Sequence, residues 1–187
     1  MGNKLTASET ALAGVVQIRS QANQDSRGSF SRWFCQQELE SFLPGQQIVQ
    51  VNHSFSRQQG TVRGLHFQLP PFAEYKLVRC IAGRVFDVAV DLRANSVTFL
   101  QAVSVELSAE ENNMLLIPPG CAHGFQTLTA DAQLLYLHSA FYQPQAEAGF
   151  RFDDPRLKIE WPLPITSMSE RDLQLPVIPQ QFHGISL

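Results

Sequence analysis

The sequence predicts an all-β fold built from antiparallel strands, as in a sandwich or a barrel. Short runs rich in β-branched and aromatic residues recur from residue 14 to residue 142, separated by Gly, Pro and Asn. Large apolar residues alternate with Asp and Ala along 86–92, which is the two-residue period of a strand. Little helical pattern lies between these runs, which argues against the alternating strand and helix units of a parallel sheet.

The expected elements follow one another as short strands joined by turns. The runs with strand composition are 14–19, 48–56, 76–81, 84–93, 101–107, 114–117 and 132–139. Ala82-Gly83 and 94–96 supply turns at the ends of 84–93. A helix is expected at 36–43, where Pro44-Gly45 stops it. After Phe141 the strand rhythm fades, so 144–187 is expected to wrap around the barrel and close over one end of it.

Length and composition predict one domain that spans 1–187. The chain has 187 residues, of which 44% are hydrophobic, enough for a sizeable core. The net charge is −3 and the 14 basic residues are scattered, so nucleic acid is not an expected partner. No apolar stretch reaches the length of a membrane span. Cys35, Cys80 and Cys121 are odd in number and widely spaced, which favours free thiols in a reducing cytoplasm.

Lys76 is an unusual residue because it stands in a run that otherwise has the pattern of a buried strand. The other lysines are Lys4 and Lys158, so solubility does not explain a lysine at this place. Two-residue parity puts Lys76 on the same face as Val78 and Cys80, and therefore inward. An unpaired charge in such surroundings costs several kcal/mol. An anion that forms during a reaction is one partner that requires a fixed positive charge there.

Two histidines lie in motifs that place an imidazole beside apolar residues. His66 follows Arg63-Gly64-Leu65, and it is either a proton carrier or a core histidine bonded to the backbone. His123 follows a Pro-Pro-Gly turn that places it at the head of a strand, in the pattern PxGxxHxF, which resembles the second motif of cupins. The first cupin motif would add two further histidines and a glutamate as metal ligands. Here that set is incomplete, since it offers His66, Glu74 and Lys76, so no metal and no oxygenase chemistry are expected.

Other candidate residues each have a structural alternative. Tyr136 lies among leucines and is either a proton donor or a core tyrosine with one hydrogen-bond partner. Asp172 stands three residues after Ser169, which is the spacing of a helix capping box. Gln50 and Asn52 share one face of 48–56 and either line a cavity or face solvent. Taken alone, Tyr136 and Asp172 each favour the structural interpretation, and Gln50 and Asn52 do not decide between the two.

A series of segments, taken in order, resembles the dTDP-4-dehydrorhamnose 3,5-epimerases, the RmlC-type cupins of rhamnose biosynthesis. The resemblance runs from about residue 25 to residue 172 and is carried by the segments 25–30, 50–54, 62–68, 76–79, 85–91, 106–110, 117–120, 122–125, 154–155 and 159–162. It implies a cupin fold, a double-stranded β-helix or jelly-roll barrel with short peripheral helices. It also implies a homodimer with exchanged N-terminal strands, without a metal or another cofactor.

The resemblance implies a chemistry for the candidate residues. The substrate is then a nucleotide-linked 4-keto-6-deoxyhexose, whose C3 and C5 both lie next to the C4 carbonyl. His66 is the base, Asp172 orients it, Lys76 stabilises the enolate oxygen and Tyr136 donates a proton on the opposite face of the sugar. His123 lies close to the substrate in the family, and Asp87 is a plausible carboxylate partner for one of these groups.

The resemblance also implies binding roles. Arg27 and Arg63 match positions that meet the diphosphate, for which a guanidinium is well suited. Part of the N-terminal motif reaches the neighbouring subunit in the family. The remaining matched positions line the pocket or lie near the nucleotide and the sugar: Phe30, Gln50, Asn52 and Tyr142.

Two departures from the family pattern bear on specificity. Arg32 stands where well-known members have Glu, and Glu74-Tyr75 replaces Gln-Gly just before Lys76. Both are expected near nucleotide or sugar contacts and to leave the four catalytic candidates intact. The function expected from the sequence is epimerisation at C3 and C5 of a dTDP-linked sugar. The alternatives are a mono-epimerase or ketoisomerase on a related sugar, and a sugar-binding cupin without catalysis.

Overall fold

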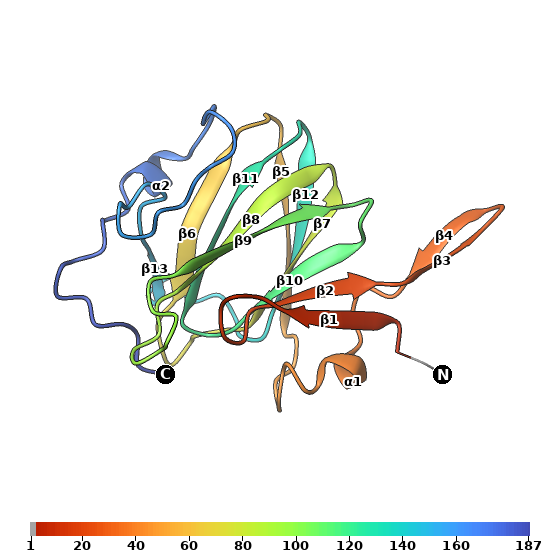
Figure 1. Cartoon of the computed structure of the whole chain (residues 1–187), viewed down its shortest axis with the longest axis horizontal. Helices are drawn as coiled ribbons and strands as arrows, with labels where there is room; N and C mark the ends of the chain where they lie inside the picture. Colours follow the sequence, from red (N-terminus) through yellow and green to blue (C-terminus); the bar gives the residue numbers. More distant parts are fainter. Residues whose placement is uncertain (1–2) are drawn as a thin grey trace.

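In the computed structural model, which describes residues 3–187, two antiparallel sheets face each other (Figure 1). The larger sheet has the strand order β1-β2-β10-β7-β12-β5, and the smaller has the order β13-β6-β11-β8-β9. Their bounds are β1 Leu5–Glu9, β2 Val16–Ser20, β5 Gln50–Ser56, β6 Val62–Gln68, β7 Lys76–Ala82, β8 Arg84–Asp91, β9 Ala102–Ser108, β10 Asn113–Ile117, β11 Cys121–Thr127, β12 Ala132–His138 and β13 Glu147–Gly149.

Along the chain, β5 to β8 and then β10 to β13 fall alternately in the two sheets. This alternation is the winding of a double-stranded β-helix, so the predicted all-β jelly-roll fold is confirmed. A separate hairpin of β3 (Ala22–Asp25) and β4 (Gly28–Ser31) extends away from the two sheets, on the right of Figure 1. The described residues contain two short peripheral helices, α1 (Gln36–Leu39) and α2 (Glu170–Leu173). No helix within residues 3–187 is long and apolar enough to cross a membrane.

The side chains of β7 show how strand parity sorts the two faces of a sheet. Val78 and Cys80 are fully buried in the cluster between the sheets, together with Phe125 from β11. Leu77, one position out of phase, packs instead in a second cluster with β2 and the segment around α1. The inward direction predicted for Lys76 from parity with Val78 and Cys80 is therefore confirmed, and its side chain is only 12% exposed.

The predicted runs each contain a strand, with ends that differ by a few residues. The strand expected to begin at His123 is β11, and the sequence patterns did not predict β1, β3, β4, β6 and β13 as strands. The helix expected at 36–43 is shorter, because α1 ends at Leu39. The next residues form turns in which the Phe42 N–H donates to the Leu39 carbonyl oxygen, three residues back, and Leu43 stays fully buried.

The C-terminal segment 144–187 lies against the smaller sheet (Figure 1, blue). Its β13 pairs with β6, and Leu157 and Ile178 pack with Leu65 and Phe67 in one apolar cluster. Near the end of the chain the Ile185 N–H donates to the Leu92 carbonyl oxygen at 2.7 Å. The segment thus contributes both core packing and, through α2, one wall of the cavity between the sheets.

Candidate active site

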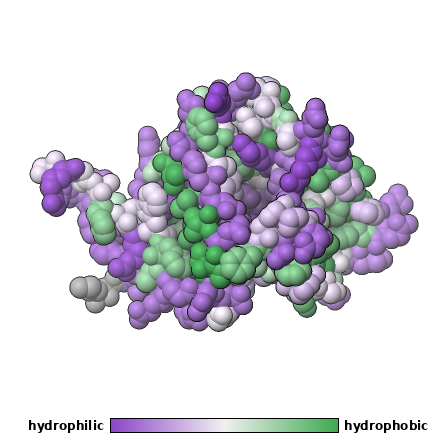
Figure 2. Space-filling model, turned by 180° about the vertical axis from the view of Figure 1, so that it is seen from behind, coloured by the Kyte–Doolittle hydropathy of each residue, from purple (hydrophilic) through white to green (hydrophobic). Residues whose placement is uncertain are grey.

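A cavity of about 720 Å³ lies between the two sheets and opens on one side of the molecule. Figure 2 shows it as a hollow bordered by both polar and apolar side chains. Strands β5, β7 and β12 of the larger sheet line one wall, β6 and β11 of the smaller sheet line another, and α2 closes a third side. A cavity of this size between rigid strands suits a ligand of nucleotide-sugar size.

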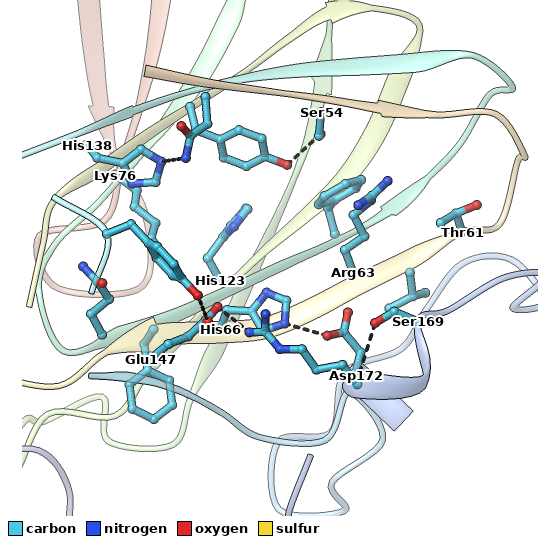
Figure 3. A pocket seen from close by; sticks show the side chains of 18 of the residues that line it. Ser54, Thr61, Arg63, His66, Lys76, His123, His138, Glu147, Ser169 and Asp172 are labelled. Atoms are coloured by element: carbon cyan, nitrogen blue, oxygen red, sulfur yellow. Dashed lines mark hydrogen bonds and ion pairs between the residues drawn. The ribbon is translucent and has the colours of Figure 1, made fainter. Parts of the chain in front are cut away.

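His66 and Asp172 form a hydrogen-bonded pair at this cavity (Figure 3). The Asp172 Oδ1 atom lies 2.8 Å from His66 Nε2 and its Oδ2 atom accepts from the Gly64 N–H at 3.2 Å. Although burial alone would raise the pKa of Asp172, hydrogen bonding and charge attraction from His66 hold it below its ordinary value. An ionised carboxylate on Nε2 keeps the proton of a neutral ring there, which leaves the Nδ1 lone pair free to act as a base.

Local structure explains how Asp172 reaches His66 from 106 residues away. Ser169 is the N-cap of α2, and its Oγ accepts from the Asp172 backbone N–H at 3.1 Å, so the predicted capping spacing is confirmed. The capping interaction uses the backbone of Asp172 and leaves its carboxylate for His66. Gly64 is needed where the strands approach, because a Cβ there would lie 2.6 Å from the Gly124 Cα, with φ at +120°.

Tyr136 faces the cavity from β12 of the opposite sheet. Its Oη lies 3.0 Å from Ser54 Oγ on β5. Burial raises the pKa of the phenol above its ordinary value, and the Ser54 hydroxyl only partly offsets this effect. The group therefore stays protonated at neutral pH and can give a proton to a strong base such as a carbanion.

Lys76 projects into the same cavity (Figure 3), and its partner in the structure is Glu74. The Lys76 Nζ atom lies 3.2 Å from Glu74 Oε1, and the other carboxylate oxygen accepts from His138 Nδ1 at 2.9 Å. The departure at Glu74 was expected to leave the four catalytic candidates intact, and all four line the cavity. The carboxylate is 8% exposed and contacts the lysine directly.

His123 and Asp87 form a second histidine–carboxylate pair, within the smaller sheet. The Asp87 Oδ1 atom lies 2.8 Å from His123 Nε2, so the carboxylate partner suggested for Asp87 is His123. Full burial raises the pKa of Asp87. His123 lines the cavity and stands directly opposite His66 in the pairing of β11 with β6.

The predicted binding residues fall into two groups. Arg63, Asn52 and Tyr142 line the cavity, and Gln50 lies beside them with its amide bonded to Asn52 and to the Tyr142 backbone N–H. This favours cavity lining over a fully solvated surface for Asn52. The Arg63 guanidinium is held in place because it donates to Ser56 Oγ and to the Phe55 carbonyl oxygen.

Arg27 and Phe30 do not lie at this cavity. Both belong to the β3–β4 hairpin, where Arg27 pairs with Asp25 at 2.6 Å and Phe30 is 76% exposed. Arg32, the other departure, pairs with Glu38 of α1 outside the cavity. Within one chain, the structure therefore separates the N-terminal motif from the residues it was expected to join.

Several cavity residues escaped the sequence reasoning, among them His138, Glu147 and Ser54. His138 could have been found from parity, because it stands two residues after Tyr136 on the same strand. Glu147 accepts from the Tyr142 hydroxyl and pairs with Arg171 of α2, which ties β13 to the wall of the cavity. Ser54 carried no distinguishing signal in the sequence beyond its parity with Asn52.

Within residues 3–187, no group of three or more His, Cys, Asp or Glu side chains is arranged to hold a metal ion. Three histidines of the cavity each bond a carboxylate instead, in the pairs His66–Asp172, His123–Asp87 and His138–Glu74, and a fourth, His53, bonds the Gln133 amide oxygen.

The sequence profile of the family dTDP-4-dehydrorhamnose 3,5-epimerase matches residues 9–180. The chain belongs to this family. It is 46% identical to a dTDP-4-dehydrorhamnose 3,5-epimerase of Sinorhizobium fredii, an alignment that covers 89% of this chain and 86% of the relative. The resemblance found in the motifs is therefore confirmed over most of the chain.

Solved structures agree with this membership of the 3,5-epimerase family. The fold matches an epimerase from Legionella pneumophila in complex with dTDP-4-keto-L-rhamnose, with a TM-score of 0.88, 38% identity and 92% coverage of both chains. It also matches ChmJ, a 3′-monoepimerase from Streptomyces bikiniensis in complex with dTDP-quinovose, with a TM-score of 0.83 and 32% identity over 90% of this chain and 85% of that one.

Proposed function

We propose that the protein inverts C3 and C5 of a dTDP-linked 4-keto-6-deoxyhexose, as in the synthesis of dTDP-L-rhamnose. One observation carries this proposal: His66, paired with Asp172, comes from one sheet, Tyr136 and Lys76 come from the opposite sheet, and all of them face one cavity. A sugar ring between the sheets has a base on one side and a proton donor on the other. Inversion of a carbon centre requires this arrangement, because the proton leaves from one face and returns to the other.

The proposed reaction moves protons only, so it needs no cofactor. His66 Nδ1 takes the proton from the carbon next to the C4 carbonyl, and the electron pair of that C–H bond moves toward O4 to form an enolate. The imidazolium that results is stabilised by the Asp172 carboxylate 2.8 Å away. Tyr136 then gives its proton to the same carbon from the opposite face, and exchange with solvent restores both groups. Repetition at the second carbon completes the double inversion.

Lys76 supplies the positive charge that the enolate oxygen requires. Its ammonium lies in a mostly enclosed wall, where a fixed charge stabilises a developing anion more strongly than it would in water. A preorganised donor of this kind contributes roughly 3 kcal/mol to the transition state. The C4 oxygen of a bound sugar would therefore lie toward β7.

Arg63 is the cationic residue of the cavity wall that we assign to the diphosphate. We further propose a homodimer in which the β3–β4 hairpin brings Arg27 and Phe30 to the cavity of a second copy. The exposure of Phe30 (76%), Val51 (56%) and Phe55 (42%) supports this, since β5 is an edge strand of the larger sheet. Figure 2 shows apolar side chains gathered between the hairpin and the hollow. Sedimentation equilibrium tests the assembly, and a monomer at micromolar concentration would contradict it.

We also propose that the chain works as one domain over 1–187, with 144–187 supplying Asp172 to the barrel. Residues 1 and 2 lie outside the described part of the chain. The free thiols of Cys35, Cys80 and Cys121 support a reducing cytoplasm as its location. Fractionation of cells that express the protein at native level tests this location.

The decisive experiment is NMR of the sugar after incubation with the protein in D₂O. With dTDP-4-keto-6-deoxyglucose as substrate, we expect deuterium at both C3 and C5. The similarity to a 3′-monoepimerase favours one alternative, a mono-epimerase, and label at a single carbon would support that interpretation instead. A complex that forms without any exchange, in the wild type and in His66→Ala alike, would leave only a sugar-binding protein.

A further inference from the structure

Lys76 and His138 stand directly opposite each other in the antiparallel pairing of β7 with β12. Two basic side chains at such a position are close neighbours, which is unfavourable when both carry charge. Glu74 places its carboxylate between them, at 3.2 Å from Lys76 Nζ and 2.9 Å from His138 Nδ1. The backbone of 74–76 is fixed here because the Tyr75 N–H donates to Ser139 Oγ and its carbonyl oxygen accepts from the Ser139 N–H.

A run of hydrogen bonds leads to this carboxylate from the rim of the cavity. Gln50 Nε2 donates to Asn52 Oδ1 at 3.3 Å, and Asn52 Nδ2 donates to His138 Nε2 at 3.4 Å. A ring that accepts at Nε2 is neutral and carries its proton at Nδ1, from which it donates to Glu74. The pair of Glu74 with Lys76 is then the charged pair of this wall, and its charges balance.

Each of the other ionisable groups lining the cavity has its own partner. The pairs are His66 with Asp172, His123 with Asp87, Glu147 with Arg171 and Tyr142, Tyr136 with Ser54, Arg63 with Ser56, and His53 with Gln133. Glu74 is therefore the carboxylate that directly balances Lys76. Although burial would raise the pKa of Glu74, its contacts with His138 and Lys76 lower it, so it stays ionised at neutral pH.

We infer that Glu74 and His138 are positioning residues for Lys76: Glu74 keeps the ammonium charged and directed along the cavity wall, and His138 holds Glu74 in place. The two act in series, because His138 reaches Lys76 only through the carboxylate. The catalytic consequence rests on the proposed function, in which Lys76 meets the enolate oxygen. The effect on the charge of Lys76 does not depend on that function.

The test uses the small number of lysines in the chain. Protein labelled with ¹³C at lysine Cε gives signals for Lys4, Lys76 and Lys158. The signal that is missing from the spectrum of Lys76→Arg belongs to Lys76. In Glu74→Gln we expect Lys76 to titrate at lower pH than in the wild type, by roughly one to three pH units, because a half-enclosed ammonium has lost its counter-charge. The exposed Lys158 is the internal control and should not move.

An unchanged Lys76 titration in Glu74→Gln would overturn the inference. The wild type gives a second measurement that needs no variant to fold. Its Lys76 signal should shift when Glu74 takes up a proton, below the ordinary glutamate pKa of about 4.3, while Lys158 shows no such step. A Lys76 signal that stays flat through this range would likewise contradict the pairing.

Kinetics then test whether the pair serves the reaction. On the alkaline side, kcat of Glu74→Gln should fall at lower pH than kcat of the wild type, with KM little changed. The surface control Glu106→Gln, which loses a half-exposed carboxylate paired with Arg84, should follow the wild type. His138→Phe keeps a ring beside Tyr136 and should lower kcat. When Glu74→Gln is already present, His138→Phe should lower kcat by less than about a further twofold. Additive losses, or an unshifted kcat profile in Glu74→Gln, would overturn the arrangement in series. If the wild type itself moves no protons, the proposed function fails and the NMR result still stands.

Discussion

Asp172→Asn isolates the contribution of one carboxylate to proton abstraction. The Asp172 Oδ1 atom lies 2.8 Å from His66 Nε2 and the residue is 4% exposed. Two full charges at this separation attract by about 6 kcal/mol at an effective dielectric constant near 20. The imidazole is only partly protonated in the transition state, so about half of this energy, or ~3 kcal/mol, is available, which corresponds to ~10²-fold in rate.

The amide adds a second effect, because its NH₂ group can donate to His66 Nε2. The ring would then carry its proton at Nδ1, and the lone pair needed for abstraction would point at the introduced amide instead of the substrate. Together the two effects predict a fall in kcat of about 10³- to 10⁴-fold, the upper range for loss of general base catalysis. KM should change by less than about threefold, because Asp172 contributes to rate and not to ground-state binding.

The assay is the initial rate of deuterium incorporation into the sugar, measured over a range of substrate concentrations. The matched control is Glu170→Gln, on the same short helix but exposed to solvent, which should retain the wild-type rate. Thermal unfolding checks that both variants fold. We expect Asp172→Asn to fold, because its amide oxygen can still accept from the Gly64 N–H. A kcat within tenfold of the wild type in Asp172→Asn would refute the role given to this pair.

Three further changes have expected outcomes. Tyr136→Phe should fold normally and should still exchange the substrate proton with solvent, but it should form inverted product at least tenfold more slowly. NMR measures both quantities, the deuterium exchange and the amount of inverted product. Asp91→Asn should destabilise the protein by about 2 kcal/mol at neutral pH. Burial would raise the pKa of Asp91, but hydrogen bonds from Arg93 and neighbouring hydroxyls outweigh it and lower the pKa to about 2. This stabilisation is therefore present above the unfolded pKa near 3.9 and is lost as the pH falls toward 2. The same difference in unfolding free energy between wild type and Asp91→Asn at pH 7 and at pH 2, measured by urea titration, would contradict it. Gly64→Ala should lower the melting temperature far more than Gly28→Ala. Both glycines have a positive φ, but only at Gly64 would a Cβ contact backbone atoms. Equal falls in melting temperature would exclude this steric explanation.

Strand parity was enough to predict the wall of the cavity that contains Lys76. The side chains of β7 alternate between two buried clusters, so the period of two survives even where both faces are covered. The same rule applied to β12 would have placed the His138 side chain on the same face of the strand as Tyr136, toward the cavity. Strand β6 was harder to find, because Val62 is its one β-branched residue and Gly64 interrupts it where it approaches β11 most closely.

Contacts between distant segments could not be derived from local patterns. The contact of Asp172 with His66 joins residues 106 positions apart, and only the family resemblance suggested it. Glu74 was interpreted as a change near the sugar contacts, since nothing in the sequence says that its carboxylate turns toward Lys76. Arg27 and Phe30 lie on a hairpin that leaves the body of the chain, so one chain alone does not bring them to the cavity.

The histidine–carboxylate pairs of the cavity differ in how they are built, and this bears on which one performs the chemistry. Asp87 stands in a central strand beside His123, and Glu74 is fixed by the pairing of β7 with β12, so both pairs belong to the sheets themselves. Asp172 comes from the C-terminal segment and is held by the Ser169 cap and the Gly64 N–H. The His66 pair is therefore completed only when that segment docks on β6. The His66 ring is 28% exposed, which leaves it accessible to a substrate proton, while the His123 and His138 rings stay enclosed at 7% and 10%.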